Sequence, residues 1–426
     1  MSRGCPLLLF GDQQLSWSTF QEAIVWLSKS SNNNRMERME LVNSIQEVSG
    51  GRHFNESDTM EEERSSHLNV LLRLTNSFRS TDPRDKVFSL LGLTSAGRDQ
   101  NDWPEELAPD YTRSVQEVYT GAAKYCIRTT DSLDILSQFK HEKVAKTASS
   151  HLYFPSWVPR WDLADSTRRI SAFTLHWGPD GCRFLNEKHN RASQNTRVMM
   201  DQDTPLSTLR VLGLQIDMVN VCLPTVTSYD ADLHAGVSVH YRRYLLNLIQ
   251  QLYGMCNELV TDTDTSHSFK VAFYMVTIAG LVSEQPVMTA CSQTPYETFL
   301  FLSQEWENAH TRWSDTDDRF RKYPATWRPL ARKLWHEYTH SYIASLQRLM
   351  NRRLFITSSC QLGLGPASMM SGDTVAILFG GNVPYILRPL ANNQWHFVGE
   401  CYLDGYMDGE AMEHRDSSRD EWFEMV

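Results

Sequence analysis

The sequence lacks an excess of positive charge. Lys and Arg total 41 against 51 Asp and Glu, which gives a formal net charge of −10. Because nucleic-acid phosphates and anionic membranes are bound by basic surfaces, this balance argues against both as partners. The local basic stretch at 319–332 follows three aspartates, at 315, 317 and 318, and we expect it to be a solvated face or loop.

Long hydrophobic runs and cysteine motifs are also lacking. The longest apolar run, 271–282, is far shorter than the roughly 20 residues of a membrane-spanning helix, and the run at 6–10 is too short for a signal-peptide core. The eight cysteines show neither C-x-x-C nor framework spacing. Free thiols suit a reducing compartment, so we expect a cytoplasmic protein without membrane association.

Three segments carry the most information, and Asp82-Pro83-Arg84-Asp85-Lys86 is the first. Asp82 is a good N-cap, Pro83 costs no hydrogen bond at the first helical position, and Asp85 favours the positive end of the helix. Gly92 would permit a left-handed exit from this helix. We therefore interpret the acids and Arg84 as architectural, with catalysis as the less favoured alternative.

The second segment is Pro155-Ser156-Trp157-Val158-Pro159-Arg160-Trp161. Its two prolines exclude a helix, because each removes a donor and restricts the preceding residue. The pattern predicts an extended ribbon whose Trp157 and Trp161 fill a core. A paired-tryptophan platform for a ligand is the alternative.

The third segment, 351–414, alternates short apolar runs with turns. Candidate strands lie at 354–357, 374–379, 385–388, 395–399 and 400–403, with turns expected at 363–366, 380–382 and 391–393, which predicts a small antiparallel barrel. Its motif residues are Gly363, Gly365, Pro366, Gly372, Asp373, Pro384, Arg388, Gly399, Glu400, Gly409 and Glu410. Glu400, Asp404, Asp408 and Glu410 predict an acidic pole, either a solvated turn or a pair with Arg388 or Arg353, with acid–base chemistry as the alternative.

One motif suggests a metal. His336-Glu337-Tyr338-Thr339-His340 fits H-E-x-x-H, in which two histidines on one helical face bind zinc and Glu337 polarises a water. A third ligand at the extended-motif spacing is missing, and Leu334, Tyr338, Tyr342, Leu346 and Leu349 form an apolar stripe instead. We therefore favour a structural helix and expect no cofactor, with a zinc-dependent hydrolase using Glu337, His336 and His340 as the minority hypothesis.

The three segments, in this order, resemble the fungal heterokaryon-incompatibility (HET) family. The family's N-terminal module is associated with nonself recognition and triggered cell death. Its markers, Ser-Tyr-x-Trp-Gly and Asp-x-x-Cys-Ile-Asn-Gln, do not occur in this chain. The resemblance therefore implies a member that lacks most of that module, and no nucleotide-cleaving residue can be assigned. The family pattern has Asp where this chain has Arg160.

These observations together predict an α+β protein with mainly helical N-terminal and central parts and a small β-barrel-like C-terminal domain. We expect a helical region at 1–165 with a flexible insertion near 28–66, a mixed middle region at 166–350, the barrel at 351–414 and a frayed tail at 415–426. Helices are predicted at 16–27, 68–78, 115–126, 240–253 and 271–283, strands at 173–177 and 209–217, and a short extended piece at 134–139. Ser114 and Glu117 have the spacing of a capping box before the helix at 115–126, with Thr112 as a rival cap. The expected function is a non-catalytic interaction or regulatory scaffold with protein partners. An enzyme, either the zinc hydrolase or an unrecognised activity on a small-molecule ligand, is the alternative.

Overall fold

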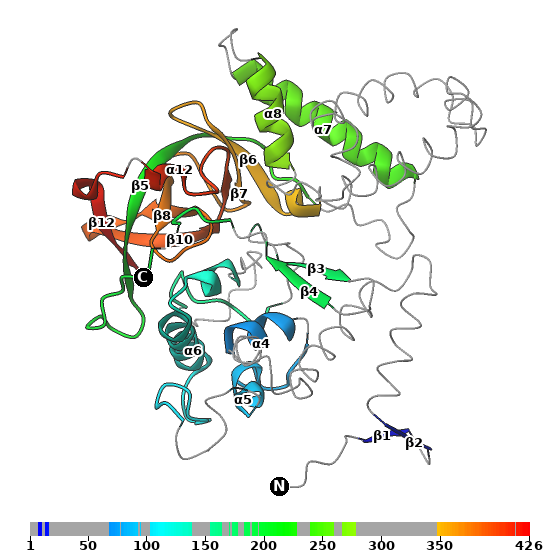
Figure 1. Ribbon diagram of the computed structural model, residues 1–426, viewed down its shortest axis with the longest axis vertical. Coiled ribbons are helices and arrows are strands. Elements are labelled where there is room, and N and C mark those ends of the chain that lie inside the picture. The colour runs from blue at the N-terminus through cyan, green and yellow to red at the C-terminus, as the bar shows by residue number, and fades with distance from the viewer. Residues whose placement is uncertain are drawn as a thin grey trace. The chain divides into compact units, whose positions relative to one another are not determined.

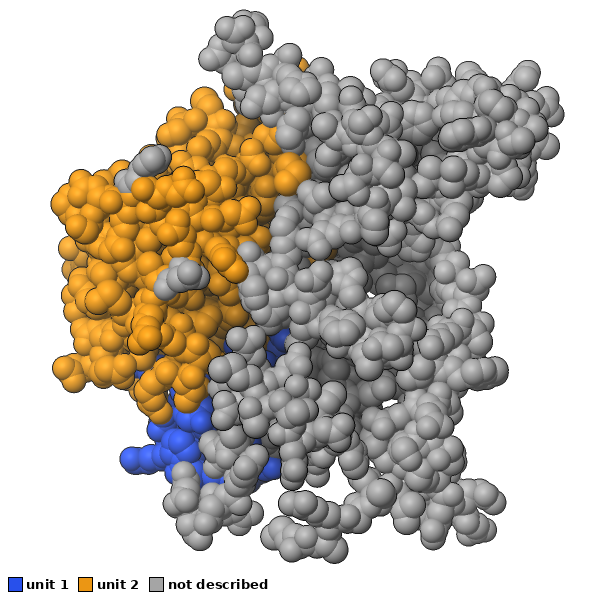
Figure 2. All heavy atoms as spheres, in the orientation of Figure 1, with its two compact units in different colours: residues 1–126, 160–165, 230–238 blue, residues 127–159, 166–229, 239–426 orange. Residues whose placement is uncertain are grey.

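The computed structural model describes residues 7–10, 13–16, 68–76, 78–92, 94, 103–138, 154–163, 170, 173–177, 183–187, 190–194, 196–227, 239–259, 266–277, 347–413 and 415–426. The chain divides into two compact units, coloured separately in Figure 2. Unit 1 comprises residues 1–126, 160–165 and 230–238. Unit 2 comprises residues 127–159, 166–229 and 239–426.

Unit 1 begins with a β-hairpin. Strands β1 (Leu7–Phe10) and β2 (Gln13–Ser16) are antiparallel, with Phe10 opposite Gln13. The prediction of a turn and helix over 11–27 is therefore wrong for 13–16, and its remainder lies outside the described residues. Two short runs separated by Gly11-Asp12 are a typical hairpin signal, which explains why residues 13–16 form a strand.

The helices of unit 1 follow the apolar periodicity. Helices α4 (Leu68–Leu74) and α5 (Asp85–Leu91) confirm two predictions, as does α6 (Val115–Thr130), whose first 12 residues lie in unit 1. The capping box before α6 is present: Ser114 N–H donates to Glu117 at 2.7 Å and Glu117 N–H donates to Ser114 Oγ at 3.2 Å. The inward residues of these helices are fully buried, among them Leu71, Leu72, Val87, Leu91, Val118, Tyr119 and Ala122.

Two details of the α5 prediction differ from the structure. The N-cap position is Arg84, because a hydrogen-bonded turn occupies 82–85 before the helix begins, although the Asp82 carboxylate accepts the Arg84 N–H at 2.9 Å as expected. Gly92 leaves the helix at φ −65°, in the right-handed region, so the exit does not require glycine.

Unit 2 is built on an eight-stranded sheet (Figure 1). The strands are β5 (Leu209–Cys222), β6 (Arg352–Thr357), β7 (Leu362–Pro366), β8 (Thr374–Leu378), β9 (Tyr385–Pro389), β10 (Gln394–Glu400), β11 (Tyr402–Leu403) and β12 (Asp420–Met425). Their order is β11-β7-β6-β5-β12-β10-β9-β8, with β8 also paired to β5. All pairs are antiparallel except β10 with β12.

The length of β5 closes the sheet on itself. Residues 209–214 of β5 pair with β12, residues 213–218 pair with β8, and residues 219–222 pair with β6. Five strands, β5, β12, β10, β9 and β8, therefore form a ring, from which β6, β7 and β11 extend. Because three of the eight strands lie outside this ring, the C-terminal part is only partly ring-shaped and is not a clean barrel.

Three local predictions in unit 2 are wrong. Residues 362–366, interpreted as a turn because of two glycines, form the buried strand β7. Residues 420–425, expected to be frayed, form β12 between β5 and β10, because Phe423 and Met425 alternate inward. Residues 134–138 form a 3₁₀ helix rather than an extended piece.

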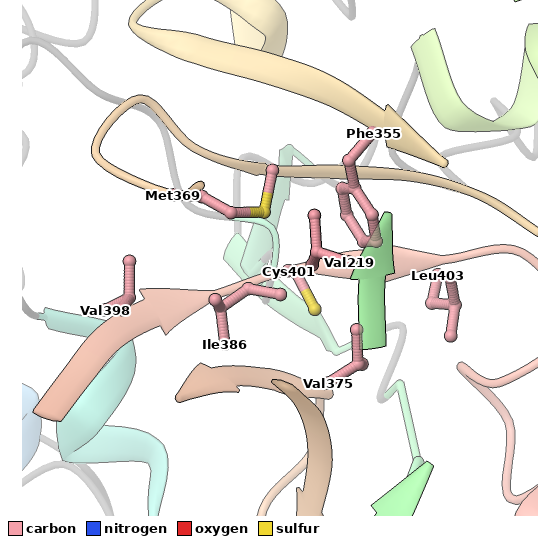
Figure 3. Close-up of a cluster of buried hydrophobic side chains, with 8 residues drawn as sticks. All are labelled: Val219, Phe355, Met369, Val375, Ile386, Val398, Cys401 and Leu403. Atoms are coloured by element: carbon pink, nitrogen blue, oxygen red, sulfur yellow. The ribbon is translucent and has the colours of Figure 1, made fainter. Parts of the chain in front are cut away.

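The ring encloses an apolar core. A cluster in Figure 3 joins side chains from six strands and the adjoining loops: Val219, Phe355, Met369, Val375, Ile386, Val398, Cys401 and Leu403. Each member is at most 1% exposed. Side chains as far apart in sequence as Val219 and Leu403 therefore have to meet before this core exists.

Unit 2 also contains a separate β-hairpin and two longer helices. Strands β3 (Phe173–Trp177) and β4 (Arg183–Glu187) form a hairpin, and helices α7 (Val239–Leu259) and α8 (Ser266–Thr277) confirm predicted helices. Helix α8 lies against β7. In the described part of the N-terminal and central regions strands accompany the helices, so the mainly helical prediction is not supported, although α+β holds. No described helix has the length and apolar character needed to cross a bilayer.

Candidate functional site

The polar residues of the first motif bind one another and the main chain of unit 1. Asp82 accepts hydrogen bonds from Arg84 Nε at 3.0 Å and Nη2 at 2.7 Å, and from Arg84 N–H at 2.9 Å. These bonds hold the pKa of Asp82 below its ordinary value. Arg84 Nη1 donates in turn to the carbonyls of Tyr111 at 2.5 Å and Arg113 at 2.9 Å. The pair thus ties the start of α5 to the segment that precedes α6.

Asp85 and Pro83 bind the same neighbouring segment. Tyr111 Oη donates to Asp85 Oδ1 at 2.6 Å, which raises the pKa of Tyr111. The Tyr111 ring meets Phe88 edge-on at 5.2 Å between centroids. Tyr119 Oη donates to the carbonyl of Pro83 at 2.8 Å. Asp85 is therefore engaged by a phenol and is not aimed at a vacant site.

Lys86 binds the loop that follows α4. Its Nζ donates to the carbonyls of Asn76, at 3.2 Å, and Phe78. Both residues lie beyond the last residue of α4, Leu74. Burial lowers the pKa of Lys86, a residue that is only 9% exposed. This lysine therefore fixes the loop between α4 and α5.

The second motif contributes to each unit. It consists of two tight turns, with Val158 N–H bonded to the carbonyl of Pro155 and Leu163 N–H bonded to that of Arg160, so the extended-ribbon prediction is wrong. In unit 2, Trp157 is 0% exposed and its Nε1 donates to the carbonyl of Ser207 at 3.0 Å, with Pro155 and Pro159 also buried. In unit 1, Trp161 is 1% exposed and meets Tyr119 edge-on at 4.9 Å, and Arg160 pairs with Asp162. Neither indole presents a ring face to solvent.

Ser156 completes the ring where strand pairing ends. Strands β10 and β12 share only two paired positions, 394 with 424 and 395 with 425. Beyond them, Phe397 N–H donates to Ser156 Oγ at 2.8 Å. Ser156 N–H and Oγ both donate to the carbonyl of Val426. A motif serine thus provides the hydrogen bonds that a longer strand would have made.

The most buried charged pair of the third motif is Arg352 with Glu400. Arg352 Nη2 lies 2.7 Å from Glu400 Oε1, and the two side chains are 5% and 6% exposed. Ile170 N–H donates to the same Oε1 at 2.6 Å, and Arg352 Nη1 donates to the Glu400 carbonyl at 3.2 Å. Sequence reasoning named Arg353 and Arg388 as partners and missed Arg352. Strand alternation was the available signal, because neighbouring arginines on β6 must point to opposite faces.

Arg388 instead binds Asp373. Its Nε and Nη2 contact the two carboxylate oxygens at 2.8 and 3.0 Å, and Asp373 is 1% exposed. Met370 N–H donates to Asp373 Oδ2 at 2.8 Å. Arg353 binds carbonyls, those of Leu223 at 2.8 Å and Met369 at 2.9 Å. Each of these arginines therefore fixes a loop to the sheet.

The motif glycines and prolines have packing roles. A Cβ on Gly363 would lie 2.3 Å from the ring of Phe355, and one on Gly365 would lie 2.8 Å from Met369 Sδ. Gly409, at φ +100°, lies against Gln194, which donates to its carbonyl at 3.1 Å. Other motif residues serve turns and pairing: Gly372 at φ +90°, Gly399 at a bulge in β10, Pro366 opposite Arg352, and Pro384, whose carbonyl accepts from Cys401 N–H.

The predicted acidic pole separates into two places. Glu400 belongs to the buried pair, whereas Asp404, Asp408 and Glu410 lie near Tyr402 and affect its ionisation. Tyr402 Oη donates to Asp404 at 3.2 Å, and Asp408 N–H donates to Glu410 at 2.9 Å. Burial raises the pKa of Asp404, with a smaller contribution from Glu410. Asp404 is thus the carboxyl here with an environment suited to acid–base chemistry.

The zinc hypothesis cannot be compared with this geometry, since His336, Glu337 and His340 lie outside the described residues. Within the described part of the chain, no three His, Cys, Asp or Glu side chains are grouped as metal ligands would be. The described motif residues therefore assemble into capping, pairing and packing contacts.

Comparison with known proteins agrees with this arrangement. Residues 273–425 match the Het-6 beta-barrel domain, a range that includes every strand of the eight-stranded sheet except β5. The chain is 24% identical over 371 residues to Heterokaryon incompatibility protein 6, OR allele, of Neurospora crassa. The aligned part covers 78% of this chain and 49% of that protein, so the chain spans about half the length of the curated relative.

No solved structure matches the chain. The two sequence matches agree with the resemblance carried by the three segments: the chain is similar to a fungal heterokaryon-incompatibility protein, and its residues 273–425 match the Het-6 beta-barrel domain.

Proposed function

We propose that the chain is a non-catalytic interaction and regulatory module in fungal heterokaryon incompatibility, acting in nonself recognition and cell death in the cytoplasm. The name of the Neurospora crassa relative, a heterokaryon incompatibility protein, supports this process. The proposal that the module is non-catalytic is supported by one observation: the polar side chains of the motifs are hydrogen-bonded within the protein. Asp82, Arg84, Asp85, Lys86, Asp373, Arg388 and Glu400 all bind neighbouring groups of their own unit. A catalytic set would direct some of these groups toward a substrate instead.

A protein partner follows from the same proposal, because a module without chemistry acts through what it binds. A small-molecule ligand and zinc remain minor alternatives, and the former would require a site beyond the contacts described here.

The experiment is a heterokaryon assay. The chain is expressed in one of two fungal strains of different incompatibility genotype, and growth rate and vital-dye uptake of the fused cells are measured. We expect the chain to change both readouts. Asp404 is the described carboxyl whose environment best suits acid–base chemistry, and it is not among the motif anchors. A non-catalytic module does not need this carboxyl, so the Asp404→Asn variant should retain the effect.

Arg352→Ala provides the matched contrast, since it removes a fold anchor and should abolish the effect through loss of folded protein. If Asp404→Asn abolishes the effect while the variant is folded and no less stable than the parent, the chain acts by catalysis and the proposal fails. The His336→Ala variant applies the same criterion to the zinc alternative.

A further inference from the structure

The outer face of the ring carries two rows of side chains near the start of β5. There β5 lies between β12 and residues 199–201, and β5 and β12 are adjacent in Figure 1. Trp422 is directly opposite Leu212, and Leu212 N–H donates to the carbonyl of Met199 at 3.0 Å on the other side. Directly opposite residues project to the same face of a sheet. Met199, Leu212 and Trp422 therefore form one apolar row.

This row faces away from the core. Trp422 is 40% exposed and Met199 is 51% exposed, while the intervening inward residues Val211 and Phe423 are 0% exposed. Trp, Met and Arg are enriched in protein interfaces, and buried Trp is the commonest kind of energetic anchor. A tryptophan held on a rigid strand loses little conformational entropy when a partner covers it.

The neighbouring row is charged. Arg210 is opposite Glu424, and its Nη1 binds Asp201 Oδ2 at 2.6 Å. The Arg210 guanidinium also lies over the Trp422 ring, 4.8 Å from the centroid. The cation–π contact fixes the position of the indole. The positive charge of Arg210 is already neutralised by Asp201.

The surroundings of the apolar row are acidic on balance. Asp201, Asp203, Asp420 and Glu424 lie on or beside the face, against two basic residues, Arg210 and Arg415, which bind Asp201 and Asp420. Four acids and two bases leave a charge of −2. Glu424 accepts a bond from the neutral amide of Gln394 at 2.8 Å, and Asp203 is exposed, so both carboxylates can meet a cation.

We propose that this face, formed by Met199, Leu212 and Trp422 with the acids beside them, docks a segment of a partner protein that presents an apolar side chain next to a lysine or arginine. The apolar side chain covers the Trp422 ring, and the cation binds Glu424 or Asp203. The inference rests on the proposed function, because an interaction module needs such a surface.

The test uses a displayed library of random peptides selected on the purified full chain. We expect enriched peptides to carry an apolar residue beside Lys or Arg. For one such synthetic peptide, Trp422→Ala should raise the Kd about tenfold or more. Glu424→Lys should weaken the same peptide, and replacing its cation with Glu should restore binding to that variant.

Met218→Ala is the matched control. Met218 is 47% exposed on the same strand but lies outside both rows, so its removal should leave the Kd unchanged. If Trp422→Ala lowers the amount of folded protein, Met199→Ala and Trp422→Leu take its place, with a weakening of about threefold or more expected from each.

The proposal is overturned by the absence of enriched peptides, by enriched peptides without a cation, or by a Kd that Trp422→Ala leaves unchanged. Self-association in analytical ultracentrifugation that disappears in Trp422→Ala also overturns it, since the occupant would then be a second copy. Peptide binding reports on this face alone, whereas the heterokaryon assay with Asp404→Asn reports on the proposed function, so the two can fail separately.

Discussion

Arg352 in β6 and Glu400 in β10 form a buried ion pair, with Nη2 and Oε1 2.7 Å apart. Glu400 also accepts the N–H of Ile170, so one carboxylate joins three segments that are far apart in sequence. A buried charge is tolerated only when it is paired and hydrogen-bonded. The role of Glu400 in the third motif is therefore to stabilise the fold.

Removal of one partner of this pair should be costly. Arg352→Ala leaves Glu400 buried without its cation, and we expect the free energy of unfolding to fall by about 3–5 kcal/mol. Urea denaturation followed by fluorescence measures the change. Arg419→Ala, at an exposed position of the same unit, should change it by less than about 0.5 kcal/mol. Equal effects of the two substitutions would show that the buried pair has no special role.

Gly363 tests the close packing of β7 against β6. Gly363→Ala places a methyl group 2.3 Å from the Phe355 ring and should destabilise unit 2 by about 1–3 kcal/mol. Gly254→Ala in α7 is the control, because nothing lies within 4 Å of the added atom. In a helix interior this change should stabilise by about 0.5–1 kcal/mol. Opposite signs in urea denaturation are the expected result, and a neutral Gly363→Ala would contradict the packing described here.

Trp157 anchors the second motif in unit 2. Trp157→Ala removes a fully buried indole and its bond to the Ser207 carbonyl, and we expect a loss of about 3–5 kcal/mol in the free energy of unfolding. Trp422→Ala removes the same side chain from an exposed position and should cost about 1 kcal/mol or less. If Trp157 were a ligand platform, its loss would leave stability nearly unchanged.

Asp404 should make stability depend on pH in a defined direction. Burial raises its pKa in the folded chain, so the folded state holds this proton more tightly than the unfolded state. The stabilising contribution is therefore complete below the ordinary pKa near 3.8 and is lost as the pH rises through the folded value. Asp404→Asn lacks this loss, so the stability of the variant relative to the parent should increase between pH 4 and pH 7. A relative stability that stays constant or decreases would count against the buried environment of Asp404.

The zinc hypothesis makes its own prediction. If residues 336–340 have the structural role that we favour, EDTA and added Zn²⁺ leave the melting temperature unchanged, and His336→Ala removes no bound metal. Elemental analysis of protein purified without added metal provides the measurement. Stoichiometric zinc, lost in both His336→Ala and His340→Ala, would establish the metal site.

Several features were predictable because their causes are local. The apolar spacing of 68–78, 115–126 and 240–253 predicted helices α4, α6 and α7, and Ser114 with Glu117 predicted the start of α6. The runs at 354–357, 374–379, 385–388 and 395–399 predicted strands β6, β8, β9 and β10. Local propensity and period sufficed for each of these elements.

Other features could not be predicted, because they depend on partners distant in sequence. Gly363 and Gly365 are predicted to lie in a turn, yet both belong to strand β7. Glycine is needed there because Phe355 and Met369 occupy the space that a side chain would fill. The charged stretch at 420–425 became a strand only because β5 and β10 offer edges on both sides. In the same way, only the register of β6 places Arg352, and not Arg353, against Glu400.

Local sequence was sufficient to predict the elements with a clear apolar period, the capping box before α6, the absence of helix at the proline-flanked tryptophans and the family resemblance. The tertiary structure alone decided how β5 closes the ring, which arginine meets each buried carboxylate and how Ser156 completes the seam beside β12. The physical reason is that helix periods and caps are determined within a few residues, whereas ring closure and buried ion pairs require the simultaneous placement of segments separated by tens to hundreds of residues.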